Sequence, residues 1–293
     1  MFKKTVALGN FDGMHLGHIA VLNKALAVSG DTFAPCALLF TEHSIKSLTG
    51  IAPPKLMTDE ERRKFITDFG FEIEEIHFNR IRNFSTQEFV DEILVKILNA
   101  GAVVCGYNYR FGKKAVGDAE LLRSLCTERG IECHIVSEVD CDGEAISSTA
   151  IRALIGNGKI KKANRMLGRK FGFSSPVIHG DERGRSWGFP TANQLLPDGF
   201  VMPKFGVYAS EVTVDSKKYK GVTNIGDRPT IGTKTVLSET YIIDLNENLY
   251  DKEIDIRLID FIRPEKKFSS FDELAAQIKA DTDKVKGCVF TDV

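Results

Sequence analysis

Two histidines near the start of the chain stand three residues apart in a glycine-rich segment, Gly9-Asn10-Phe11-Asp12-Gly13-Met14-His15-Leu16-Gly17-His18. The segment follows an apolar run at 6–8 and opens a helical pattern at 16–27. At a helix start, both imidazoles lie beside free backbone N–H groups that attract phosphate oxygens, and Gly17 leaves the backbone open to a nucleotide. The segment therefore predicts a site that stabilises charge on a transferring phosphoryl group. A chance His-x-Gly-His is the alternative, which the strand-turn-helix setting disfavours.

Two further segments of the first half carry groups that suit phosphate. Ile146-Ser147-Ser148-Thr149-Ala150-Ile151-Arg152 places three hydroxyls at a helix start and a guanidinium one turn later. These are phosphate donors, although an ordinary helix cap also uses Ser and Thr. Gly106-Tyr107-Asn108-Tyr109-Arg110-Phe111-Gly112 follows a predicted strand. Asn108 and Arg110 are candidates for nucleotide or flavin contact, whereas Tyr109 and Phe111 are candidates for packing the loop.

The second half carries a glycine-rich basic segment that runs from Gly180 through Gly184, Arg185 and Gly188 to Pro190-Thr191-Ala192-Asn193. Backbone amides at its glycines are suited to surround phosphates. The Thr191 hydroxyl and the Asn193 carbonyl are neutral oxygen ligands for a Mg²⁺ ion that is held mainly by ATP phosphates. A hairpin that leads into a strand is the alternative interpretation.

A possible proton acceptor lies further along the second half. Asn224–Thr230 is predicted to form a turn, and Glu239 is predicted to begin the strand after it. There its carboxylate is placed to accept a proton from an attacking hydroxyl. A solvated surface glutamate is the alternative.

The elements that position these residues differ between the two halves. In the first half, strand and helix patterns alternate, which predicts a parallel sheet covered on both faces with ligands at the carboxyl ends of its strands. The predicted strands are 6–8, 36–40, 75–78, 102–106 and 134–136, and the predicted helices are 16–27, 59–66, 85–98 and 118–128. After a helical region at 148–167, strands at 207–214, 219–222, 240–245 and 254–259 predict an antiparallel barrel, closed by one helix around 271–278. We place the domains at 1–168 and 169–293.

Composition limits the classes of function. The chain has 293 residues and a formal net charge of −1, from 39 basic and 40 acidic residues. That balance gives no reason to expect a nucleic-acid partner. No signal sequence and no apolar run of roughly 20 residues is visible, so we expect a soluble cytoplasmic protein, a monomer or weak oligomer. The six cysteines lack Cys-x-x-Cys spacing, which favours reduced thiols over a metal cluster at Cys126, Cys133, His134 and Cys141.

The first-half segments resemble the nucleotidylyltransferase superfamily with the His-x-Gly-His motif, and more narrowly the FMN adenylyltransferase module of bacterial bifunctional FAD synthetases. Asn108 and Tyr109 replace the family's Asp and Phe, and Phe40-Thr41-Glu42-His43-Ser44 keeps His43 but loses two prolines. The resemblance implies a Rossmann-like fold with His15, His18 and Arg152 as catalytic residues. It implies flavin contacts from His43, Tyr109 and Arg110. It implies ATP contacts from Gly9, Phe11, Asp12, Gly17, Asn108, Ser147, Ser148 and Thr149.

The second half resembles riboflavin kinase. The matching segments are Gly188–Asn193, Gly206–Tyr208, Asn224–Thr230 and Glu239, which leads to Leu249-Tyr250-Asp251. Tyr241 stands where the family has His, and Asp251 where it has Gly. The resemblance implies that Thr191 and Asn193 assist Mg²⁺ and that Glu239 is the base for the riboflavin 5′-hydroxyl. It implies ATP contacts from Gly180, Gly184, Arg185, Gly188 and Pro190.

The expected function is therefore the ATP-dependent phosphorylation of riboflavin to FMN and the adenylylation of FMN to FAD with release of pyrophosphate. Two alternatives stay open. One is a riboflavin kinase whose N-terminal domain has lost adenylylation, which the altered loop at Glu42 and Ser44 supports. The other is a flavin-binding regulatory or storage protein without turnover.

Overall fold

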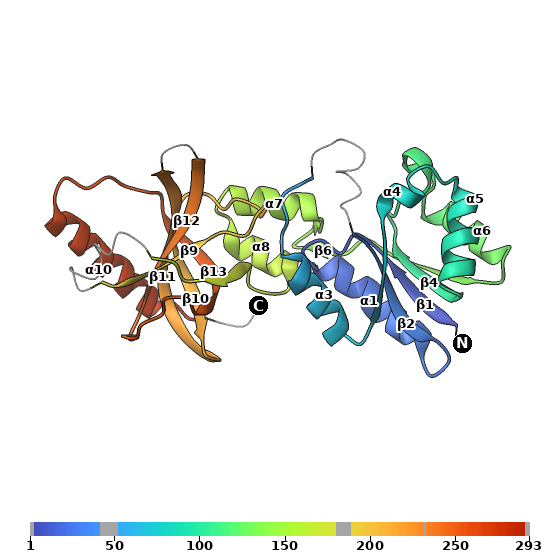
Figure 1. Cartoon of the computed structure of the whole chain (residues 1–293), viewed down its shortest axis with the longest axis horizontal. Coiled ribbons are helices and arrows are strands. Elements are labelled where there is room, and N and C mark those ends of the chain that lie inside the picture. The colour runs from blue at the N-terminus through green and yellow to red at the C-terminus, as the bar shows by residue number, and fades with distance from the viewer. Residues whose placement is uncertain (1–2, 42–51, 180–188, 231–232, 291–293) are drawn as a thin grey trace. The chain divides into compact units, whose positions relative to one another are not determined.

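The computed structural model describes residues 3–41, 52–179, 189–230 and 233–290 of the chain. The chain divides into two compact units (Figure 1). The first consists of Met1–Pro53 and Asp59–Ser148, and the second of Pro54–Thr58 and Thr149–Val293.

A five-stranded parallel sheet forms the centre of the first unit. Its strands stand in the order β3-β2-β1-β4-β5, and every neighbouring pair is parallel. The strands are β1 (Lys4–Leu8), β2 (Ala34–Phe40), β3 (Glu72–Ile76), β4 (Ala100–Gly106) and β5 (Glu132–Val136). The strand order reverses at β1, so the loops after β1 and β4 leave the same edge of the sheet side by side. This confirms the predicted parallel α/β fold, in which such an edge is the usual ligand site.

Helices cover both faces of this sheet. Val6, Leu8, Val103 and Cys105 share one buried cluster with the helices on their face, whereas the alternate residues of β1 and β4 point to the face on which α1 packs. The helical elements are α1 (Leu16–Ser29), α3 (Asp59–Asp68), α4 (Phe78–Ile81), α5 (Thr86–Glu88), η1 (Phe89–Ile97), η2 (Lys113–Ala115) and α6 (Ala119–Thr127), and a small ribbon is formed by β6 (Asp140–Cys141) and β7 (Glu144–Ala145).

Two elements of the first unit differ in detail from the prediction. The predicted strand at 75–78 ends at Ile76, because His77 is the N-cap residue of α4. The predicted helix at 85–98 begins with a capping box of Ser85 and Glu88 and then widens into the π-helical η1, where Leu98 N–H donates to the Ile93 carbonyl. The predicted strand at 134–136 is the second part of β5, on which Cys133 is half-buried.

A six-stranded antiparallel barrel, nearly closed, forms most of the second unit. Its order is β8-β13-β10-β11-β12-β9, and the seam between β8 and β9 is bridged by side chains. Ser175 Oγ donates to the Leu195 carbonyl at 3.0 Å, and Gln194 Nε2 donates to the Ser175 carbonyl. The elements of this unit are α7 (Ser148–Gly156), α8 (Ile160–Leu167), β8 (Gly172–Pro176), β9 (Thr191–Leu195), β10 (Gly206–Val214), β11 (Lys217–Thr230), β12 (Thr233–Ile242), β13 (Glu253–Arg263) and α10 (Phe271–Gly287).

One local prediction for the barrel was wrong. Asn224–Thr230 is not a turn but the second half of β11, paired residue by residue with Thr233–Glu239 of β12. Glu239 consequently lies in the middle of β12 rather than at its start. Gly226 and Pro229 suggested a turn, but the long antiparallel ladder with β12 keeps this stretch extended. The antiparallel barrel and a terminal helix are confirmed, but the strand predicted at 240–245 ends at Ile242, and α10 continues to Gly287.

Candidate active sites

The glycine-rich segment after β1 makes a tight turn that carries the histidine pair. Phe11, Gly13 and Met14 have φ values of 51°, 77° and 39°. Left-handed backbone costs about 1–2 kcal/mol for each residue other than glycine, and here it is offset by complete burial of Phe11 and Met14. The turn therefore has one packed geometry that leads into α1.

The two histidines meet at the start of α1. His15 is the N-cap residue, and its Nδ1 accepts a hydrogen bond from the His18 backbone N–H at 3.3 Å. The rings stack with centroids 3.7 Å apart and 16° between their planes. A Cβ on Gly17 would lie 3.2 Å from the His15 ring, a tight contact that the glycine avoids. Because Nδ1 of His15 is an acceptor, a neutral His15 ring carries its proton on Nε2.

The segment Ile146–Arg152, which carries the three hydroxyls, is hydrogen-bonded to this turn. Ser148 Oγ donates to the Asp12 carbonyl at 3.0 Å, so Ser148 holds the turn in addition to any role toward phosphate. Ser147 is half-buried and Thr149 is exposed. Arg152 belongs to the second unit, where its Nε donates to the Pro54 carbonyl at 2.7 Å.

The loop after β4 divides into exposed and packed residues. Asn108 and Arg110 are exposed, and Arg110 is only loosely paired with Asp118, at 3.9 Å. Tyr109 stacks on Phe111, with ring centroids 6.1 Å apart, and packs against the buried cluster of the sheet. Burial raises the pKa of the Tyr109 hydroxyl above its ordinary value. Tyr109 thus packs the loop, which was one of the two roles expected for it, the other being a flavin contact. Asn108 and Arg110 are accessible to solvent.

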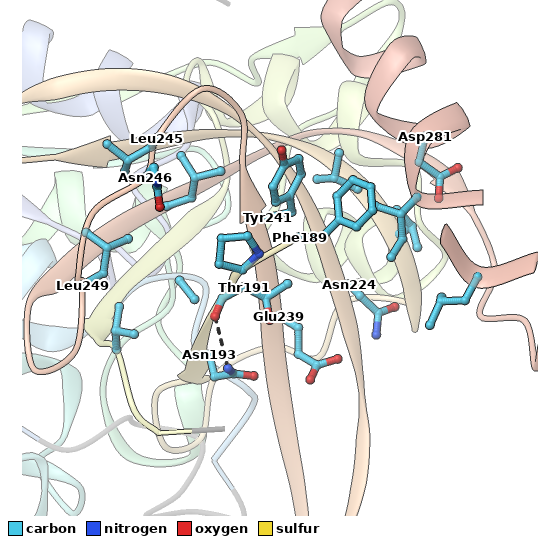
Figure 2. Close-up of a pocket in the computed structure, with 18 of the residues that line it drawn as sticks. Phe189, Thr191, Asn193, Asn224, Glu239, Tyr241, Leu245, Asn246, Leu249 and Asp281 are labelled. Atoms are coloured by element: carbon cyan, nitrogen blue, oxygen red, sulfur yellow. Dashed lines mark hydrogen bonds between the residues drawn. The ribbon is translucent and has the colours of Figure 1, made fainter. Parts of the chain in front are cut away.

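A cavity of about 1130 Å³ opens in the second unit, and predicted residues line it (Figure 2). Asn193 of β9 pairs with Glu239 of β12, which pairs in turn with Asn224 of β11. Directly opposed residues share one face of a sheet, so these three side chains form a polar row across three strands. Glu239 is exposed, as a surface glutamate would be, but it opens onto this cavity.

Thr191 lies beside the polar row. It pairs with Tyr241 on β12, and the Asn193 amide nitrogen donates to the Thr191 carbonyl at 3.3 Å, as Figure 2 shows. This hydrogen bond uses an N–H of Asn193 and leaves its amide oxygen available as an acceptor. Hydroxyl, amide and carboxylate oxygens are the hard donors that Mg²⁺ prefers. The donor set therefore fits Mg²⁺ together with phosphate oxygens.

Apolar groups make much of the remaining wall. Val207 and Val222 come from the barrel, and Phe271, Leu274 and Ile278 come from α10. On another part of the wall, Phe189 meets the Tyr241 ring edge to face at 5.4 Å, and exposed Pro190 follows it. Sequence reasoning did not name the α10 residues as site residues. The signal for them was present only as the apolar stripe at helical spacing, which any packed helix would show.

Several predicted residues cannot be placed. His43 lies outside the described residues, and so do Gly180, Gly184, Arg185 and Gly188. Among the described residues, no cluster of three or more His, Cys, Asp or Glu side chains is arranged to hold a metal ion. No helix in the described parts of the chain is long and apolar enough to cross a membrane.

Fold and sites together define a two-domain protein with a nucleotidylyltransferase-like parallel α/β unit and a barrel with a lined cavity. Two family models match it: FAD synthetase over residues 2–150 and riboflavin kinase over residues 167–289. Curated relatives named bifunctional riboflavin kinase/FMN adenylyltransferase match over nearly the whole chain. The Listeria monocytogenes protein is 36% identical, covering 95% of this chain and 90% of that protein. The Escherichia coli protein is 35% identical, covering 94% and 90%. The chain therefore belongs to the family of bifunctional riboflavin kinases/FMN adenylyltransferases.

A solved structure from Streptococcus pneumoniae has the same architecture. It is 31% identical, with a TM-score of 0.91, and the match covers 98% of this chain and 95% of that one. The protein in that structure is named a macrolide-efflux protein. The match supports the fold of the whole chain, and the family assignment rests on the sequence relatives.

Proposed function

We propose that this chain phosphorylates riboflavin to FMN in residues 169–293 and adenylylates FMN to FAD in residues 1–168. The observation that carries the proposal is the polar row of Asn193, Glu239 and Asn224, which lines a cavity of about 1130 Å³. A cavity of that size is large enough to hold a small-molecule substrate. The stacked histidines at the start of α1 support the second activity.

In the kinase reaction, Glu239 accepts the proton of the riboflavin 5′-hydroxyl as that oxygen attacks the γ-phosphorus of ATP, and ADP leaves. Thr191 and Asn193 would hold Mg²⁺, which when bound neutralises charge on the phosphates. The apolar wall of Val207, Val222 and α10 suits the flavin ring. A ring bound there would direct the riboflavin 5′-hydroxyl toward the polar row. Positioning and charge stabilisation supply most of the acceleration in such transfers.

In the adenylyltransferase reaction, a phosphate oxygen of FMN attacks the α-phosphorus of ATP, and pyrophosphate leaves. His15 and His18 stand at the N-terminus of α1, where the helix dipole and free N–H groups favour anions. Nε2 of a neutral His15 ring is the atom that carries the proton and can donate it to a phosphate oxygen. Within the first unit, Ser148 joins the histidines in the set proposed to hold the triphosphate, with Asn108 and Arg110 at the neighbouring strand end. The role of Arg152 toward the triphosphate stays a prediction from the sequence motif.

Two incubations test the proposal, each followed by chromatography of the flavins. Riboflavin with ATP and Mg²⁺ is expected to give FMN and then FAD, and FMN with ATP and Mg²⁺ is expected to give FAD. If riboflavin is converted to FMN but no FAD forms in either incubation, the adenylyltransferase activity is contradicted and the protein is a riboflavin kinase. Flavin that binds but does not change in either incubation would contradict both activities and leave a binding protein.

A further inference from the structure

Arg62 lies close to the histidine turn without belonging to any of the motifs. It stands in the first turn of α3, and only 13% of its side chain is exposed. Its Nη1 donates to the Asn10 carbonyl at 3.2 Å, and its Nη2 pairs with Asp59 Oδ1 at 3.2 Å. Its Nε is buried without an acceptor in the described part of the chain. A guanidinium is thus held inward on a helix whose other charges are mainly on the surface.

The carbonyl that Arg62 binds is the entry to the left-handed turn. Asn10 immediately precedes Phe11, whose φ is 51°, and the turn then continues through Gly13 and Met14 to His15. Left-handed backbone at such residues persists only where the surroundings hold it. Ser148 holds this turn at the Asp12 carbonyl, and Arg62 holds it two residues earlier. The planar guanidinium fixes direction as well as distance.

We propose that Arg62 is a positioning residue for adenylyl transfer: it fixes the Asn10 carbonyl and thereby the turn that presents His15 and His18 to the triphosphate. The inference rests on the proposed function of the first domain. Arg62 acts through the turn and does not touch the reacting atoms. Its positive charge adds to that of the α1 N-terminus, which favours the same anion.

The adjacent residue on α3 provides a matched control. The Arg63 side chain is 46% exposed and pairs with Glu75 at 2.6 Å. Arg63→Met removes the same charge from the same helix without reaching the turn. The riboflavin kinase activity of the same molecule provides a second reference, since its polar row comes from other strands.

The test compares the wild type with Arg62→Met, Arg62→Lys and Arg63→Met, by measuring kcat and the KM for ATP with FMN as the other substrate. We expect Arg62→Met to lower kcat/KM about 10- to 100-fold, as misplacement of catalytic groups does, while the kinase activity stays at the wild-type level. Arg62→Lys, which keeps one donor, is expected to restore part of kcat. Guanidinium ion added to Arg62→Met is expected to restore part of it as well.

Two results would overturn the inference. One is an Arg62→Met protein whose adenylyltransferase kinetics equal those of Arg63→Met. The other is an equal loss of both activities in Arg62→Met with no recovery in Arg62→Lys, which indicates general destabilisation. A wild-type protein that does not convert FMN would instead contradict the proposed function itself.

Discussion

Asn193, Glu239 and Asn224 come from three strands, and pairing register alone places them in one row. Among them, Glu239 is the only ionisable side chain, because the other two are amides. The proposed kinase mechanism therefore depends on one carboxylate. At the other site, the proposed mechanism divides the charge of the triphosphate between the histidines and the N–H groups at the start of α1.

Glu239→Gln is expected to lower FMN formation by about 100-fold or more, the usual contribution of a general base. Formation of FAD from supplied FMN should stay unchanged, because the first unit has its own sheet and core. Chromatography of flavin products measures both rates. Glu253→Gln is a suitable control, since Glu253 is an exposed residue at the start of β13. Loss of both activities in Glu239→Gln would refute separate sites.

His15→Ala with His18→Ala should have the opposite effect. We expect FAD formation from FMN to fall about 100-fold or more, as when preorganised donors to a transition state are removed, while riboflavin is still phosphorylated. His134→Ala serves as control, because His134 is paired with Glu132 on β5. Unchanged FAD formation in the double variant would remove the histidines from the mechanism.

The types of residue at both sites could be predicted from the sequence, but their contacts could not. His15 and His18 were expected together at the start of a helix, and their rings do meet there. The role of Arg62 was not predicted, because its spacing of three residues from Asp59 is that of an ordinary ion pair on the surface of a helix. Its contact with Asn10 is tertiary, between residues 52 apart, and no local pattern encodes it.

Among the elements, α10 connects stability and site most directly. Its buried Asp281 accepts hydrogen bonds from Nε and Nη2 of Arg263 on β13, and both residues line the cavity that Phe271 and Leu274 also line. The ion pair between Asp281 and Arg263 therefore holds α10, which carries the apolar wall of the cavity, against the barrel.

Asp281→Asn is expected to lower the free energy of unfolding by about 1–3 kcal/mol, because it leaves a largely buried guanidinium without its charge partner. It should also raise the KM for riboflavin more than the KM for ATP, since the displaced wall is the apolar one. Urea unfolding and kinase kinetics measure these effects. Asp283→Asn, exposed on the same helix, is the control, and equal behaviour of the two variants would contradict this role.

The start of α10 predicts a dependence on pH. Hydrogen bonds from Lys266 and then from Ser269 lower the pKa of Glu273 to about 2, from an ordinary value of 4.5. A lowered carboxyl pKa stabilises the fold above the unfolded-state value, and the contribution is lost as pH falls toward the folded-state value. The difference in unfolding free energy between the wild type and Glu273→Gln should thus narrow as pH falls below about 4.5. A difference that stays constant as the pH falls would contradict the ion pair.

Most elements could be predicted from periodicity, whereas the edges of the barrel could not. In the parallel sheet, β1, β2 and β4 are apolar runs and were predicted, and β5 was predicted from His134 onward. Only the last two residues of β3, Glu72–Ile76, were predicted, because three of its five residues are glutamates. β8, Gly172–Pro176, has little apolar alternation, and only pairing with β13 makes it a strand. β9 follows a glycine-rich segment and closes the barrel through Gln194, whose amide donates to carbonyls of Ser175 and Ile254. Such closure depends on tertiary geometry.

At the scale of the whole molecule, the proposal assigns each unit its own use of ATP. The kinase transfers the terminal phosphoryl group to a hydroxyl, and the adenylyltransferase transfers the nucleotidyl group to a phosphate. The two units have separate sheets, and the two family models match separate ranges, 2–150 and 167–289. The two reactions should therefore be distinguishable by which phosphorus of ATP enters the product.

Isotope transfer tests that claim most directly. The protein is incubated with riboflavin or with FMN and with ATP labelled at either the α- or the γ-phosphorus, and the flavins are separated. From riboflavin, γ-label should enter FMN and FAD, whereas α-label should enter FAD alone. From unlabelled FMN, α-label should enter FAD and γ-label should appear only in pyrophosphate. FMN labelled from the α-phosphorus, or no labelled flavin from either ATP, would contradict the account.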